Sequence, residues 1–127
     1  MIFPGVGAFG CAIEALESKG LLAALHEYIA SGKPYFGICI GMQVLFQSST
    51  ENPDKKGLGL IPCPIEEFSN TDKSVPHMGW NAVELLDSAD KSDEGMDKAA
   101  HYYFVHSYRA TYDPVAYPDA EIGRAHV

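Results

Sequence analysis

Two glycines flank a single cysteine in the segment Gly37-Ile38-Cys39-Ile40-Gly41, which leaves a short apolar run and enters a helical pattern. This spacing is typical of a nucleophile elbow, in which a sharp strand-to-helix turn strains the backbone of the nucleophile. Side chains two positions away on either side would collide across the turn, so glycine is expected at both places. The pattern predicts that Cys39 projects from the carboxyl end of a strand, beside a helix N-terminus that favours its thiolate.

A simpler interpretation of Cys39 is a buried cysteine in a core strand, because free cysteine is among the most buried residue types. The flanking sequence favours the elbow. Lys33-Pro34 introduces a buried strand over residues 35–38, and an apolar stripe at helical spacing follows the turn at Met42, Leu45 and Phe46. We therefore expect a helix over about residues 42–47 and a surface loop over residues 48–56.

The N-terminal third predicts a βαβ unit. A strand end at Ile2-Phe3 runs into the glycine-rich loop Gly5-Val6-Gly7, whose N–H groups could hold an oxyanion or a phosphate, although a plain turn has the same pattern. Its spacing matches neither a dinucleotide fingerprint nor a P-loop. Two helical stripes follow, interrupted at residues 18–20: Phe9, Ile13 and Leu16, then Leu21, Leu22, Leu25 and Ile29. Parallel strands would place this loop and Cys39 at the same edge of a sheet.

The C-terminal half has a different sequence pattern from the N-terminal third. Prolines and short apolar runs predict antiparallel strands over residues 65–68 and 82–86, and the polar, acidic residues 87–98 predict a loop with a helical turn. An aromatic and β-branched run predicts one strand over residues 102–108. His106 in this strand is either a general base or a structural residue. No element is expected beyond Pro118.

The amino-acid composition argues against several classes of function. The hydrophobic fraction of 46% with 20% charged residues is that of a globular chain, and no apolar run approaches the ~20 residues that cross a bilayer. The net charge of −8, with only 9 scattered Lys and Arg, argues against nucleic-acid binding. Three cysteines without close spacing indicate neither a disulfide framework nor a metal site. We expect no metal, no cofactor and no membrane contact, and a cytosolic location because no signal peptide is visible.

Four segments carry a family resemblance: Pro4-Gly5-Val6-Gly7-Ala8-Phe9-Gly10, Gly37-Ile38-Cys39-Ile40-Gly41-Met42-Gln43, Val75-Pro76-His77-Met78-Gly79-Trp80-Asn81, and residues 102–108. Together they resemble the glutaminase part of imidazole glycerol phosphate synthase. The first two are shared by class I, or triad, glutamine amidotransferases, and the other two are more specific to the histidine-biosynthesis branch. The resemblance spans roughly residues 2–118. It implies an α/β fold with a three-layer, flavodoxin-like sheet, mostly parallel with a small antiparallel extension, incomplete at both ends.

The resemblance also implies a chemistry. Cys39 would attack the side-chain amide of L-glutamine and release ammonia, which passes to a (β/α)₈ barrel cyclase, either a separate subunit or a fused domain. The oxyanion would be held by the Ile40 N–H and, after a peptide reorientation, by an N–H of the loop Gly5, Val6 and Gly7. The residues implied to hold glutamine are Gln43, Ser107 and Tyr108.

The segment Pro76, His77, Met78, Trp80 and Asn81 has two interpretations. Its residues could form a packed turn anchored by Trp80, whereas aromatic and methionine side chains also suit a protein interface. The resemblance favours the interface, at the contact with the cyclase.

One part of the family pattern is missing. The triad histidine and glutamate come from a Gln-Phe-His-Pro-Glu type segment that these 127 residues do not contain. We interpret residues 1–118 as a partial amidotransferase domain and residues 119–127 as a tail unlike the family. We expect the 127 residues to be inactive alone. The source gene is expected to encode an upstream strand and a downstream His-Pro-Glu. Two alternatives stay open: another triad amidotransferase or cysteine hydrolase, and a non-catalytic interaction module of the same fold. A plant source would place the protein in plastids.

Overall fold

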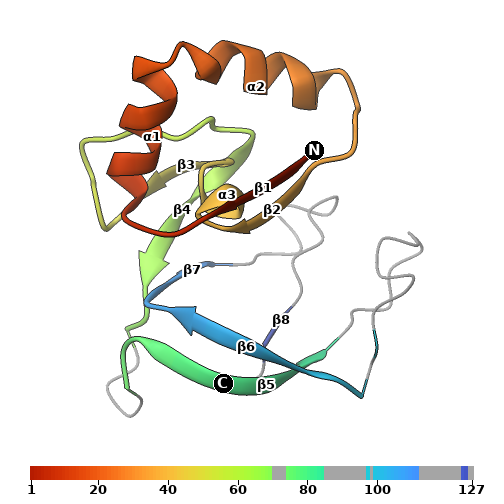
Figure 1. The fold of residues 1–127 in the computed structure, drawn as a ribbon. Helices are drawn as coiled ribbons and strands as arrows, with labels where there is room; N and C mark the ends of the chain where they lie inside the picture. Colours follow the sequence, from red (N-terminus) through yellow and green to blue (C-terminus); the bar gives the residue numbers. More distant parts are fainter. Residues whose placement is uncertain (70–73, 85–96, 98, 112–123, 126–127) are drawn as a thin grey trace. The chain divides into compact units, whose positions relative to one another are not determined.

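The computed structural model describes residues 1–69, 74–84, 97, 99–111 and 124–125 (Figure 1). The chain forms two compact units, Met1–Glu67 with Tyr108–Thr111 and Phe68–Ser107 with Tyr112–Val127. Among the helices of the described residues, none combines the length and apolar character needed to cross a membrane.

The first unit begins with the predicted βαβ arrangement. Strand β1 (Ile2–Gly5) leads through helices α1 (Phe9–Ser18) and α2 (Leu21–Ala30) to strand β2 (Phe36–Cys39). The two strands pair in parallel, from Ile2 opposite Phe36 to Gly5 opposite Cys39. Gly20 separates the two helices because its φ of 64° lies in the left-handed region, which glycine adopts without steric cost. The predicted strands, helices and parallel crossover are therefore confirmed.

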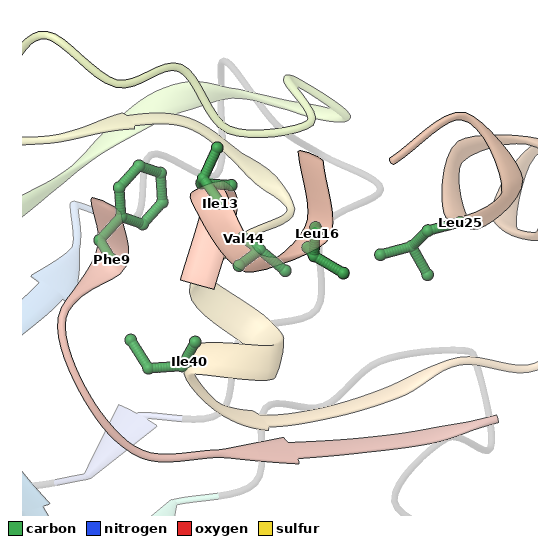
Figure 2. Close-up of a cluster of buried hydrophobic side chains, with 6 residues drawn as sticks. All are labelled: Phe9, Ile13, Leu16, Leu25, Ile40 and Val44. Atoms are coloured by element: carbon green, nitrogen blue, oxygen red, sulfur yellow. The ribbon is translucent and has the colours of Figure 1, made fainter. Parts of the chain in front are cut away.

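The core of this unit lies between the helices. It is built from Phe9, Ile13 and Leu16 of α1, Leu25 of α2, Ile40 of the short helix α3 (Ile40–Gln43), and Val44 (Figure 2). The α1 members recur at helical spacing, so one face of the helix is buried.

The sheet face opposite α3 carries exposed apolar side chains, contrary to the prediction that the strand over residues 35–38 is buried. Phe36 is 62% exposed and Ile38 45% exposed. Gly37 faces the first turn of α3, since a Cβ built on it would lie 2.6 Å from Gly41. Successive residues of a strand point to opposite faces, so Phe36 and Ile38 point away from α3.

The prediction of a helix over residues 42–47 is wrong. Helix α3 ends at Gln43, and Phe46–Ser49 form strand β3, which pairs in parallel with β4 (Ile61–Glu67). This pairing buries Phe46 and Ser49 and outweighs the helical spacing of the apolar residues. The predicted loop accordingly starts after Ser49, and β4 starts earlier than expected.

Strand β4 also pairs antiparallel with β7 (Tyr108–Ala110), which completes the three-stranded order β3-β4-β7. Pro62 and Pro64 are both exposed within β4. Its register with β3 shifts between Phe46 and Ser48, an irregularity of the kind that accommodates proline in a sheet.

The second unit contains an antiparallel sheet of β5 (His77–Glu84), β6 (His101–His106) and β8 (Arg124–Ala125), in the order β6-β5-β8. The single strand expected over residues 102–108 is wrong. It is divided at Ser107, because β6 pairs with β5 whereas Tyr108 begins β7 of the first unit.

The other C-terminal predictions are partly tested. Strand β5 begins before the expected residue 82, and β8 contradicts the expectation of no element beyond Pro118. Residues 85–96 and 98, which include most of the predicted acidic loop, lie outside the described residues. The α/β class is confirmed, with parallel pairs at β1–β2 and β3–β4 and an antiparallel extension.

Candidate active site

Cys39 has the backbone conformation that the elbow pattern predicts. Its φ of 54° and ψ of −114° make it the single non-glycine residue with positive φ among the described residues. Such a conformation costs about 1–3 kcal/mol and persists only where the surroundings enforce it. The residue ends β2, immediately precedes α3, and is exposed to solvent.

The backbone packed around Gly37 and Gly41 leaves room only for glycine at both positions. A Cβ at Gly37 would lie 2.6 Å from the carbonyl carbon and oxygen of Gly41, and a Cβ at Gly41 would lie 1.7 Å from the Phe3 carbonyl oxygen. Both distances are far inside van der Waals contact. The chain therefore turns from β2 into α3 with no room for a side chain at either position, and the predicted elbow geometry is confirmed.

Tyr35 stabilises the turn between β2 and α3 through a hydrogen bond to Gly41. Its hydroxyl donates a short hydrogen bond to the carbonyl oxygen of Gly41. Burial raises the pKa of Tyr35 from 10.0 to about 12, so the hydroxyl keeps its proton to higher pH than an exposed tyrosine does. The ring also packs edge-on against Phe3, with centroids 6.3 Å apart. The strand before Cys39 and the strand beside it are thus held to the same helix.

The glycine loop begins beside Cys39. Gly5 is the register partner of Cys39 in the parallel pair, and a Cβ on it would lie 3.5 Å from the Ile40 Cβ. Val6 is 96% exposed, and Gly7 has a φ of 122°, which disfavours any side chain there. Ile40 is the first residue of α3, so its N–H has no partner within the helix. Two sources of backbone N–H therefore flank Cys39, as an oxyanion site needs.

The predicted glutamine-holding residues occupy different places. Gln43 is the last residue of α3 and is buried, with 6% exposure. Ser107 lies in the second unit, where its carbonyl oxygen accepts a 3.0 Å hydrogen bond from the Phe68 N–H. Tyr108 lies in the first unit, where burial, followed by the negative charges of Glu67 and Glu51, raises the pKa of its hydroxyl.

The other two cysteines differ from Cys39 in environment. Cys11 is exposed on α1, and Cys63 is buried in β4. Burial, followed by the charge of Glu66, raises the pKa of the Cys63 thiol, which lowers its thiolate fraction. Within the ranges that the structure describes, no group of three or more His, Cys, Asp or Glu side chains is placed to hold a metal ion.

The predicted interface segment is divided between the two faces of β5 and β6. Met78 and Trp80 are 59% and 68% exposed, and lie opposite Val105 and Tyr103 on β6, which are exposed as well. On the other face, the Asn81 side-chain amide lies 2.7 Å from His77 Nε2, both half-buried.

His106 and Phe104 share the face of His77 and Asn81. The His77 ring lies 5.6 Å from the His106 ring and 6.0 Å from the Phe104 ring, centroid to centroid. His106 also packs against Phe68, with centroids 5.0 Å apart. Pro76 precedes β5 and is exposed. The alternation leaves Met78, Trp80, Tyr103 and Val105 as one apolar surface, which we call the tryptophan face.

Two residues that sequence reasoning missed lie next to the glycine loop. Glu51 Oε2 accepts a 2.8 Å hydrogen bond from the Phe9 N–H, and Asn52 Oδ1 accepts one of 2.8 Å from the Gly10 N–H. They lie in a segment predicted as a plain surface loop. The available signal was Ala8, which occupies the N-cap of α1 without a side chain that can accept these hydrogen bonds.

Comparison with known proteins assigns the family. A family model described as glutamine amidotransferase class-I matches residues 1–122 of the 127. The chain belongs to the class I glutamine amidotransferase family. In this amidotransferase chain, the strained Cys39 lies between its two glycines and beside the loop of Gly5, Val6 and Gly7.

Relatives of this amidotransferase chain include both separate and fused proteins. It is 45% identical over 117 residues to the imidazole glycerol phosphate synthase hisHF of Emericella nidulans, covering 90% of this chain and 21% of that protein. It is 47% identical over 108 residues to the imidazole glycerol phosphate synthase subunit HisH of Desulfitobacterium hafniense, covering 85% of this chain and 50% of that subunit. It is 46% identical over 111 residues to the chloroplastic hisHF of Arabidopsis thaliana, covering 87% and 18%.

The amidotransferase chain thus spans about half the length of that HisH subunit and about a fifth of the fused proteins. The proposed tail over residues 119–127 remains a prediction, since residues 119–123, 126 and 127 lie outside the described residues.

We expect Gly41→Ala to lower the free energy of unfolding by at least about 3 kcal/mol, because the new Cβ must displace the Phe3 carbonyl oxygen. Gly5→Ala is the matched control, since its Cβ would meet Ile40 at an ordinary contact distance and should cost less than about 1 kcal/mol. Urea unfolding of both variants measures the difference. Equal stabilities for the two variants would contradict the packing described for the elbow.

Proposed function

We propose that this chain carries the nucleophile of a glutaminase that supplies ammonia to the cyclase of an imidazole glycerol phosphate synthase, in histidine biosynthesis. The observation that carries the proposal is the positive φ of Cys39 between two glycines that admit no Cβ. A cysteine that only packs in a core needs neither a strained backbone nor an exposed side chain. A nucleophilic cysteine needs an accessible sulfur and backbone N–H donors fixed nearby. The relatives named imidazole glycerol phosphate synthase support the choice of reaction.

The chemistry follows from the order of the groups. The Cys39 thiolate adds to the carboxamide carbon of glutamine, and the carbonyl oxygen becomes an oxyanion. The Ile40 N–H and an N–H from the Gly5, Val6 and Gly7 loop stabilise that charge. The proposed activating histidine, which took the proton of the Cys39 thiol, returns it to the amide nitrogen. Collapse of the adduct then breaks the C–N bond and releases ammonia, leaving a glutamyl thioester on Cys39. Water then hydrolyses the thioester to glutamate and restores the thiol.

Gln43 is proposed to help hold the substrate because it lies one helical turn beyond Cys39 and is buried, so its amide has little access to water. Ser107 and Tyr108 are proposed to hold glutamine through their backbone. The activating histidine and glutamate are proposed to come from a His-Pro-Glu segment elsewhere in the source gene. The protein is proposed to act in the cytoplasm, or in plastids as the name of the Arabidopsis relative suggests for a plant.

The tryptophan face is the proposed contact with the cyclase. The hisHF relatives unite both parts in one protein by name, which supports a close association of the two. Exposed Trp80 and Tyr103 pack edge to face with ring centroids 5.5 Å apart, and large aromatic side chains are the residues that most often dominate binding energy in interfaces. Pro76, His77 and Asn81 flank or support this face, and ammonia is proposed to pass nearby.

The catalytic proposal is tested with Cys39→Ala and the matched variant Cys11→Ala, made in the protein expressed from the complete source gene. Glutamate release is measured in the presence of the cyclase and its nucleotide substrate. Cys39→Ala should lower kcat by at least about a thousandfold, because the variant lacks the sulfur on which the proposed thioester forms. Cys11→Ala removes an exposed thiol on α1 and should leave kcat within about twofold. Unchanged turnover in Cys39→Ala would refute the proposal.

The interface proposal is tested with Trp80→Ala. With the cyclase supplied as a separate subunit, the Kd of the complex between the variant and the cyclase should rise by at least about thirtyfold, as expected for the loss of an aromatic anchor. Glu17→Ala, on the exposed side of α1, is the control and should leave the Kd unchanged. Equal affinities for Trp80→Ala and the unmodified protein, measured by calorimetry, would exclude the tryptophan face as the contact.

A further inference from the structure

The start of α1 depends on groups from a distant part of the chain. Its N-cap residue, Ala8, has an extended backbone and no side chain that can accept a hydrogen bond. The first N–H groups of a helix need acceptors from outside the helix. Glu51 and Asn52 provide them, each at 2.8 Å, to Phe9 and Gly10 respectively. These contacts join residues 42 positions apart.

The segment that carries Glu51 and Asn52 is itself fixed to the sheet. The Glu51 N–H donates to Ser49 Oγ at 3.2 Å, and the Asn52 N–H donates to the Ser49 carbonyl oxygen at 3.2 Å. The Thr50 N–H donates to the Ile65 carbonyl oxygen at 2.9 Å. Ser49 and Ile65 are both buried. The caps are therefore attached to the paired strands β3 and β4 rather than to a free loop.

Asn52 also determines which residue fits at the second position of α1. A Cβ at Gly10 would lie 2.9 Å from Asn52 Cγ, so the amide group lies directly against the glycine backbone. Gly10 is buried although it carries no side chain. The hydrogen bond and the close packing are separate observations that place the same side chain over the same turn.

The glycine loop is consequently held at both ends. Gly5 is fixed by its pairing with Cys39, and Phe9 and Gly10 are fixed by Glu51 and Asn52. Only Val6, Gly7 and Ala8 lie between these two attachments. Any reorientation of a loop peptide toward the substrate must occur within them, and its end point depends on where α1 begins.

We propose that Asn52 is a positioning residue for the glutaminase reaction: by holding the Gly10 N–H, it fixes the end of the glycine loop and so places the loop N–H that stabilises the oxyanion. This inference rests on the proposed function. Asn52 touches no reacting atom and acts through the loop. It is a better test of the idea than Glu51, because removing Glu51 would also remove a negative charge from the helix N-terminus and from the surroundings of Tyr108.

The test compares Asn52→Leu, which keeps the approximate size and loses the acceptor, with Asn52→Asp, which keeps an acceptor oxygen. Both are made in the protein expressed from the complete source gene, and glutamate release is followed with the cyclase and its nucleotide substrate present. Asn52→Leu should lower kcat by about tenfold to a hundredfold, because loss of a whole oxyanion donor costs about a hundredfold to a thousandfold. KM should stay within about threefold, and Asn52→Asp should recover most of kcat.

Two controls separate positioning from damage to the fold. Lys55→Ala breaks the neighbouring 2.9 Å ion pair to Glu14, in which the Lys55 side chain is 35% and the Glu14 side chain 60% exposed, and should leave kcat within about twofold. The rate at which iodoacetamide alkylates Cys39 should be unchanged in Asn52→Leu, since the elbow itself is intact.

Three results would overturn the inference: a normal kcat in Asn52→Leu, an Asn52→Asp variant as slow as Asn52→Leu, or an alkylation rate that falls in proportion to kcat. Failure of the proposed function is recognised separately, by glutamate release that survives Cys39→Ala.

Discussion

The close approach of α3 to β1 is the constraint on which the rest of the candidate site depends. A Cβ at Gly41 would lie 1.7 Å from the Phe3 carbonyl oxygen, so the helix can start where it does only if that residue is glycine. The same turn holds Cys39 at a positive φ, at a cost of about 1–3 kcal/mol. Burial of Ile40 and Val44 in the helical core provides the packing that offsets this cost.

That constraint also places the neighbouring groups. Because β1 carries both the Phe3 carbonyl and Gly5, the strand that packs against α3 is also the strand that places the glycine loop beside Cys39. The far end of the loop is attached through Glu51 and Asn52 to the strands β3 and β4. The loop beside Cys39 is therefore held by two sheets: its first residue by the pair β1–β2, and the helix start after it by β3 and β4.

The features predictable from sequence were those with local causes. The elbow follows from the sterics around Cys39, and the parallel βαβ unit follows from hydrophobic periodicity. The strand at Phe46–Ser49 was predicted as helix and loop because its neighbours have helical spacing, and only pairing with β4 decides otherwise. The division of the aromatic strand at Ser107 likewise depends on two different partner strands. The caps at Glu51 and Asn52 join residues 42 apart, a distance at which residue patterns carry no information.

The most direct measurement of the central claim is the detection of the glutamyl thioester. The protein expressed from the complete source gene, turning over glutamine with the cyclase and its nucleotide substrate, is quenched in acid, digested and analysed by mass spectrometry. The account predicts a mass increase of one glutamyl group on the peptide that contains Cys39 and none on the peptides of Cys11 or Cys63. A glutamyl group on another residue, or active turnover with no modification of Cys39, would contradict it.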